Sequence, residues 1–121
     1  MTSIAIMNAK GGVGKSTLTM AIAETLSAFH GLSVLMIDAD GQMSLSLMTA
    51  PGDALADARA RNATLVGYFA GRLLRNEDLH WPETVMTGVS DLEEAEKIYL
   101  LPGEMDLPLR TMRTHLLPVL P

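Results

Sequence analysis

A glycine-rich stretch near the start of the chain, residues 8–17 (NAKGGVGKST), constrains the fold of these 121 residues more than any other feature. It follows the apolar run 4–7 and precedes a segment in which apolar residues recur at helical spacing. The stretch therefore predicts a strand, a loop and a helix in succession, with the helix over residues 15–30 and Gly31 as its left-handed C-cap. A phosphate-binding loop requires this order of elements.

The composition of the loop explains how it would hold a phosphate group. Glycines lack a Cβ, so consecutive N–H groups can point at phosphate oxygens, and the first helical turn adds its own N–H groups. Lys15 is expected to reach the β- and γ-phosphates, and the Ser16 hydroxyl to take a magnesium position. Ala9 replaces the first glycine of the usual pattern, but an incidental glycine-rich turn would not call for Lys-Ser at the loop exit. The predicted nucleotide-binding residues are Gly11, Gly12, Val13, Gly14, Lys15, Ser16 and Thr17.

A second apolar run, residues 33–38, ends in acidic side chains. Its position after the helix predicts a parallel strand joined by a right-handed crossover. In an open α/β sheet the ligand lies beyond the carboxyl ends of the strands, so Asp38 and Asp40 are expected at the same edge as the loop. Two carboxylates there suit a role in positioning magnesium's water ligands and in activating an attacking water. The alternative is a polar strand end that only begins a turn.

The other elements follow from periodicity and turn residues. They are a short helix beginning within 42–47, a weak helix within 51–61, a helix over 64–75, turns over 76–92, a third strand over 97–101 and a last helix from Asp106. One stripe of the first helix is expected to pack on the sheet: Leu18, Ile22, Leu26 and Phe29. The predicted class is α/β, a P-loop NTPase-type parallel sheet with flanking helices, incomplete in these residues.

Composition narrows the function classes. A net charge of −5 argues against nucleic-acid binding by this stretch, and its scattered arginines are expected on solvated helix faces. The absence of cysteine excludes disulfides and thiolate metal sites, which suits a reducing cytoplasm. No apolar run approaches the length of about 18 residues that a membrane span needs, and no basic signal-peptide region is present. The expected location is the cytoplasm.

Three segments resemble the ParA/MinD family of partition and positioning ATPases. Lys10 followed by residues 11–17 is similar to the family's deviant phosphate loop, and residues 38–42 (DADGQ) resemble its D-x-D-P-Q segment. Gly41 replaces the usual proline there, which leaves the segment less preorganised. Residues 99–103 (YLLPG) resemble a strand that ends in a proline and a small residue. The matches occur in the family's order and cover residues 1 to about 110.

The resemblance implies ATP binding with Mg²⁺ and slow hydrolysis by a homodimer that sandwiches nucleotide between its subunits. Lys15 and the loop amides would hold the phosphates, and Lys10 would contact the phosphates bound by the other subunit. Ser16 and Asp38 would serve the magnesium ion, and Asp40 would activate the water. The predicted catalytic residues are thus Lys10, Lys15 and Asp40. The resemblance also implies a role in plasmid or chromosome partition and a ParB-like protein that stimulates hydrolysis. It further implies non-specific DNA binding through a later part of the chain.

The family has a further strand, ending in a magnesium-binding aspartate, after the helix expected to end near Leu117. Residues 1–121 are therefore expected to be the N-terminal portion of a ParA-type domain, marginally stable and prone to association. Whether this chain itself hydrolyses ATP is left open. The alternatives are a non-catalytic remnant that binds nucleotide or pairs with full-length relatives, a MinD-like positioning ATPase, and a nucleotide-dependent synthase.

Overall fold

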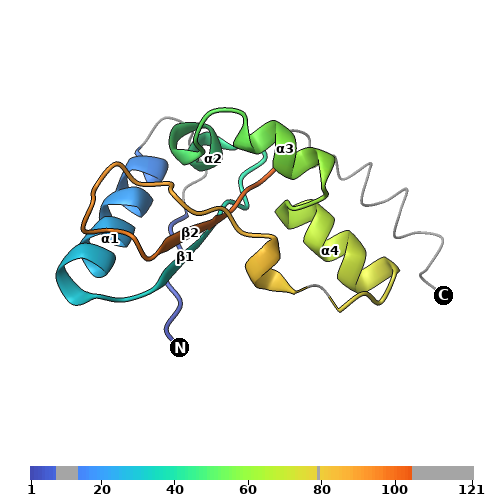
Figure 1. Ribbon diagram of the computed structural model, residues 1–121, viewed down its shortest axis with the longest axis horizontal. Coiled ribbons are helices and arrows are strands. Elements are labelled where there is room, and N and C mark those ends of the chain that lie inside the picture. The colour runs from blue at the N-terminus through green and yellow to red at the C-terminus, as the bar shows by residue number, and fades with distance from the viewer. Residues whose placement is uncertain (8–13, 79, 105–121) are drawn as a thin grey trace.

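A computed structural model describes residues 1–7, 14–78 and 80–104. Its elements are α1 (Lys15–His30), β1 (Val34–Ile37), α2 (Ser44–Thr49), α3 (Ala54–Ala60), α4 (Leu65–Leu74), the 3₁₀ helix η1 (Trp81–Glu83) and β2 (Ile98–Leu101). Figure 1 shows the two strands between α1 and α4, with α2 and α3 along one side. The helix predicted from Asp106 lies outside the described residues.

The two strands form a parallel ladder. Val34 pairs with Ile98 and Ile37 with Leu101, and α2 to η1 lie in the connection between the strands. On the other edge of β2, Met86 and Leu100 exchange two backbone hydrogen bonds of 2.7 and 3.0 Å in an antiparallel bridge. The predicted α/β class, with a parallel sheet and flanking helices, is confirmed.

The boundaries of α1 agree with its sequence signals. Gly14 precedes the helix with φ 87° and Gly31 follows it with φ 65°, both in the left-handed region where glycine has no Cβ penalty. The Gly31 N–H donates to the carbonyl of Ser27 at 3.0 Å, which closes the C-terminal turn. The helix predicted over residues 15–30 is confirmed.

The packing face of α1 agrees only in part with the predicted stripe, since Ile22 and Leu26 are half-buried. Leu18 and Phe29 are 52% and 80% exposed, whereas Ala23 and Ser27 are buried. The backbone N–H of Lys97, just before β2, donates to the Ser27 hydroxyl oxygen at 3.3 Å. A face of small side chains lets the helix approach the sheet closely, and this rotation turns the larger Leu18 and Phe29 outward.

The buried core joins α1, α2 and both strands. Leu100 and Ile98 are 0% and 1% exposed, so β2 is the most deeply buried element. Methionine fills space between the elements of this core, since Met36 of β1 is buried in it and Met86 packs against it. The buried members are Ala23, Met36, Leu45, Val89, Ala95, Ile98 and Leu100.

The strand predicted over residues 4–7 is not formed. Ile4 and Met7 are 62% and 87% exposed, and the described backbone offers them no ladder partner. On β1, Leu35 and Ile37 are also exposed, at 43% and 52%. A β-strand forms by hydrogen bonding to a neighbouring strand. An apolar run with no such neighbour among the described residues therefore does not form a strand.

Candidate functional site

The start of α1 and the exits of both strands meet at one edge of the sheet. Lys15, the first residue of α1, places its Nζ 3.2 Å from Oδ2 of Asp40, three residues beyond β1. Gly103, two residues beyond β2, lies against the backbone of Asp38. The predicted convergence of Asp38 and Asp40 on the N-terminus of α1 is therefore present in the structure.

The N-terminus of α1 is arranged to receive an anion. Gly14 supplies no side-chain cap, and the first turn carries no acidic residue. The N–H of Leu18 donates to the Gly14 carbonyl at 2.9 Å, so the N–H groups of Lys15, Ser16 and Thr17 precede the first intrahelical bond. These N–H groups and the positive end of the helix dipole together favour a bound negative charge.

Lys15 and Asp40 form an ion pair at this helix end, with side chains 27% and 40% exposed. The Gln42 N–H donates to Oδ1 of Asp40 at 3.0 Å. This hydrogen bond first, and the bond from Lys15 second, lower the pKa of Asp40 below its ordinary value. Asp40 is consequently ionised at neutral pH and balances the charge of Lys15.

Asp38 is held inside the protein, only 4% exposed. Its Oδ2 accepts the Ser46 N–H at 2.8 Å and also the Ser46 hydroxyl. Its Oδ1 accepts the Asp40 N–H at 3.2 Å. The hydrogen bonds of both carboxylate oxygens thus fix the segment between β1 and α2.

Sequence reasoning did not assign roles to Ser46 and Gly103. The Ser46 side chain is fully buried, and its Oγ accepts the Gly103 N–H at 3.1 Å. A Cβ on Gly103 would lie 2.9 Å from the Asp38 carbonyl oxygen, so glycine permits the close approach of the two strand exits. The sequence signal was the small residue after Pro102, but nothing in the sequence pairs it with Ser46.

The rest of the predicted loop falls partly outside the described residues. Lys10, Gly11, Gly12 and Val13 are not described, whereas Ser16 and Thr17 lie in the first turn of α1. The described residues contain no group of three His, Cys, Asp or Glu side chains that could hold a metal ion. The available donors, a hydroxyl and carboxylates, suit Mg²⁺ that arrives with phosphate oxygens as its remaining ligands.

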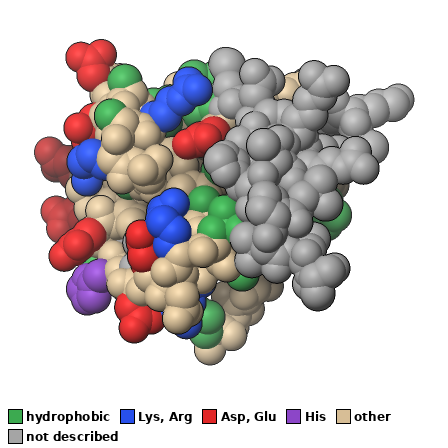
Figure 2. All heavy atoms as spheres, turned by 90° about the vertical axis from the view of Figure 1, so that its right-hand side faces the viewer, with side chains coloured by type: hydrophobic (Ala, Val, Ile, Leu, Met, Phe, Trp, Pro, Cys, Tyr) green, Lys and Arg blue, Asp and Glu red, His purple; other side chains and the backbone are tan. Residues whose placement is uncertain are grey.

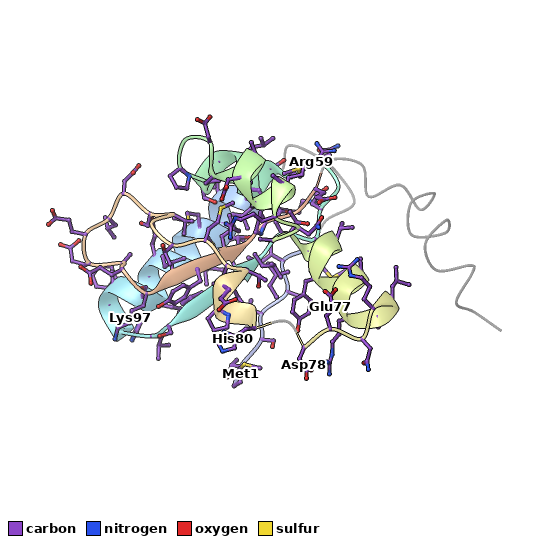
Figure 3. The ribbon with its side chains drawn as sticks, turned by 45° about the vertical axis from the view of Figure 1, so that its right-hand side comes forward. Met1, Arg59, Glu77, Asp78, His80 and Lys97 are labelled. Atoms are coloured by element: carbon purple, nitrogen blue, oxygen red, sulfur yellow. The ribbon has the colours of Figure 1, made fainter. Side chains whose placement is uncertain are left out.

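Three arginines away from the site are paired with acids. Figure 2 shows Lys and Arg side chains interspersed with Asp and Glu on the face that it presents, and Figure 3 labels two of the acidic partners, Glu77 and Asp78. The pairs are Arg61 with Asp57, Arg72 with Asp78 and Arg75 with Glu77, at 2.9, 2.6 and 2.7 Å. For these arginines the predicted solvated faces are confirmed.

Comparison with protein families matched residues 4–105 to the model of the CobQ/CobB/MinD/ParA nucleotide binding domain. This range contains the glycine-rich loop, Asp38, Asp40 and the exit of β2. A search of curated proteins and a search of solved structures each found no match. In the part of the chain that the structure describes, none of the helices has the length and apolar character needed to cross a bilayer.

Proposed function

Because the chain belongs to the CobQ/CobB/MinD/ParA nucleotide-binding domain family, we propose that it binds ATP with Mg²⁺ at the N-terminus of α1. The observation that carries this proposal is the Lys15–Asp40 pair at a helix end without an acidic residue in its first turn. A phosphate group placed there would meet a cation, the N–H groups of the first helical turn and a carboxylate suited to holding a water.

Each residue of the proposed site has a distinct role. Lys15 binds the phosphates together with the amides of the glycine-rich loop, from Gly11 to Gly14, and the Ser16 hydroxyl faces magnesium. The metal, when bound, neutralises phosphate charge. Asp38 contributes at the edge of the magnesium shell, and Asp40 orients the attacking water.

Phosphate binding would also change the partner of Asp40. Lys15 and Asp40 neutralise each other at 3.2 Å. A bound phosphate carries more charge than one carboxylate and draws the Lys15 ammonium toward itself. Asp40 is thereby released to accept a hydrogen bond from water, which couples nucleotide binding to the arrangement for hydrolysis.

At the level of the cell, the proposal is a ParA-type switch in plasmid or chromosome partition. Two copies sandwich nucleotide, with Lys10 of each contacting the phosphates held by the other. A ParB-like protein stimulates turnover in the cytoplasm, and DNA contacts come from residues other than those described. The resemblance of the loop and of residues 38–42 supports this finer assignment.

A nucleotide-binding module without turnover is the second candidate. It is favoured by the engagement of both Asp38 oxygens with Ser46 and Asp40, which leaves this carboxylate little capacity for a magnesium-bound water. Such a module would bind ATP through Lys15 and release no phosphate.

The test is calorimetric titration of the chain with ATP and Mg²⁺, together with a phosphate-release assay. Lys15→Ala is compared with Lys97→Ala, a lysine near the opposite end of α1 that contacts the Gly31 carbonyl. We expect saturable binding in the wild type and in Lys97→Ala, and none in Lys15→Ala. Binding with phosphate release supports the ATPase, and binding without it supports the second candidate. Equal binding by Lys15→Ala would refute the proposed site.

A further inference from the structure

The start of α2 is capped by a side chain from outside the helix. Its N-cap, Met43, has φ 55° and makes no side-chain capping bond. Instead, Asp38 accepts the N–H of Ser46, the third residue of α2, at 2.8 Å from eight residues away. The position of α2 relative to β1 therefore depends on this carboxylate.

The Ser46 hydroxyl joins the exits of the two strands. It donates its one hydrogen to Asp38 and accepts the Gly103 N–H at 3.1 Å, so both of its bonds are within the protein. The side chain has no exposed surface, which prevents it from touching nucleotide or water. Removing the hydroxyl would leave a buried N–H without its acceptor and a buried carboxylate without one donor.

Asp38 transmits this constraint to Asp40. Its second oxygen accepts the Asp40 N–H at 3.2 Å, and this bond fixes the turn that follows β1. The Asp40 carboxylate then leaves that turn toward Lys15, at 3.2 Å. A series of hydrogen bonds thus runs from Gly103 through Ser46 and Asp38 to the backbone N–H of Asp40, and the side chain of Asp40 pairs with Lys15.

We propose that Ser46 is a positioning residue of the nucleotide site, whose buried hydroxyl holds Asp38 so that the Asp40 carboxylate lies where the attacking water must be oriented. The effect on catalysis rests on the proposed function. The contact between Lys15 and Asp40 does not, because it forms within the chain itself. Gly41 follows Asp40 and meets no atom within 4 Å of an added Cβ, so local packing does not fix the turn. The Gln42 and Met43 N–H groups hold Asp40 within the turn, and Asp38 with Ser46 holds the turn relative to the strand exits.

The first experiment compares Ser46→Ala with Ser44→Ala, an exposed serine at the start of the same helix. We expect Ser46→Ala to bind ATP within about threefold of wild type, because Lys15 and the loop are untouched, but to release phosphate about 10- to 100-fold more slowly. Ser44→Ala should match wild type in both. Unchanged turnover in Ser46→Ala would overturn the proposal.

A double variant separates positioning from general stability. In the Asp40→Asn background, Ser46→Ala should cause no further loss of turnover, because its effect passes through the Asp40 carboxylate. A merely structural role would instead lower turnover again by a similar factor, and that result would contradict the inference.

A readout without nucleotide keeps this inference distinct from the proposed function. NMR titration of the carboxyl carbons should give Asp40 a pKa nearer its ordinary value in Ser46→Ala than in wild type, since the carboxylate loses its fixed place beside the Gln42 N–H and Lys15. If wild type neither binds nor hydrolyses ATP, the proposed function fails while this comparison still decides the positioning role. If Ser46→Ala does not fold, Ser46→Thr and Ser46→Cys replace it, with the low Asp40 pKa expected only in the hydroxyl-bearing variant. Equal pKa values in those two would overturn the inference.

Discussion

The Asp40 carboxylate, 3.2 Å from the Lys15 ammonium, would compete with a bound phosphate for that ammonium. Asp40→Asn removes the competing charge, so ATP affinity should equal or exceed that of wild type. Loss of the carboxylate should lower single-turnover phosphate release by about 10²- to 10⁴-fold. Calorimetry and a phosphate-release assay on the same preparation measure both. Weaker ATP binding with unchanged turnover would mean that Asp40 supports the loop and not the water.

The hydrogen bond from the Gln42 N–H to Asp40, together with the Lys15 pair, makes the stability of the chain depend on pH. The pKa of Asp40 is lowered in the folded state, so its contribution is complete above the unfolded pKa of about 3.9 and is lost as pH falls through the folded value. We expect wild type to exceed Asp40→Asn in free energy of unfolding by about 0.2–1 kcal/mol at pH 7, the range for an exposed pair.

Urea titrations of both proteins at pH 7 and pH 3 measure this difference. It should shrink at pH 3, and at pH 7 it should also shrink when salt is raised to about 1 M, because the pair is partly exposed. A difference that grows on acidification would have the wrong sign for a carboxyl with a lowered pKa.

The sequence predicts those candidate site residues that are recognisable from the residues next to them in the chain. Lys15 follows a glycine loop and opens a helix, and Asp38 and Asp40 follow a strand, so the topology of a parallel sheet predicts their meeting. Ser46 lies in a short helix with no catalytic pattern, and its partner Gly103 is 57 positions away. That contact depends on the distance between the exits of β1 and β2. A local sequence pattern does not predict this distance.

At the scale of elements, α4 offers the sharpest test of local structure. Its N-cap, Thr64, is 2% exposed, accepts the Gly67 N–H at 3.1 Å and donates to Glu104 Oε1 at 2.8 Å. Thr64→Ala removes both bonds, so we expect a loss of about 1–2 kcal/mol in the free energy of unfolding. Urea titration measures the loss.

Two further variants interpret that result. Thr64→Ser retains a hydroxyl and should lose less than half as much as Thr64→Ala. Thr25→Ala, at an exposed position within α1 whose hydroxyl donates to the Ala21 carbonyl, should change stability little. If Thr25→Ala and Thr64→Ala cost the same, the cap does not account for the effect.

The elements whose bounds the sequence predicts most closely have a clear signal at one or both ends. Gly14 and Gly31 delimit α1, Thr64 begins α4, and the turn residues before β2 delimit that strand. The failures concern partners. The stripe of α1 was predicted from the helical spacing of large apolar residues, but close packing selected Ala23 and Ser27. Residues 4–7 have the composition of a strand but no described neighbour to pair with.

At the scale of the whole molecule, the proposed dimer and simple adhesion make opposite predictions. A nucleotide sandwich requires ATP and Lys10, which contacts the partner's phosphates. Adhesion through exposed apolar side chains, such as Leu35 and Ile37 on β1, requires neither. Sedimentation velocity with ATP and Mg²⁺, with ADP and without nucleotide therefore separates them, and we expect dimers only with ATP.

Variants of both surfaces complete this test. Lys10→Ala should bind ATP but weaken the dimer about 10- to 150-fold, because a charged hydrogen bond contributes about 1.5–3 kcal/mol. Lys97→Ala removes a lysine that precedes β2 and contacts the far end of α1, and this variant should dimerise as wild type does. Ile37→Glu should leave an ATP-dependent dimer intact while reducing any association that occurs without nucleotide. Dimers that form equally with ADP, persist in Lys10→Ala and disappear in Ile37→Glu would refute the sandwich and identify the exposed face of β1 as the site of association.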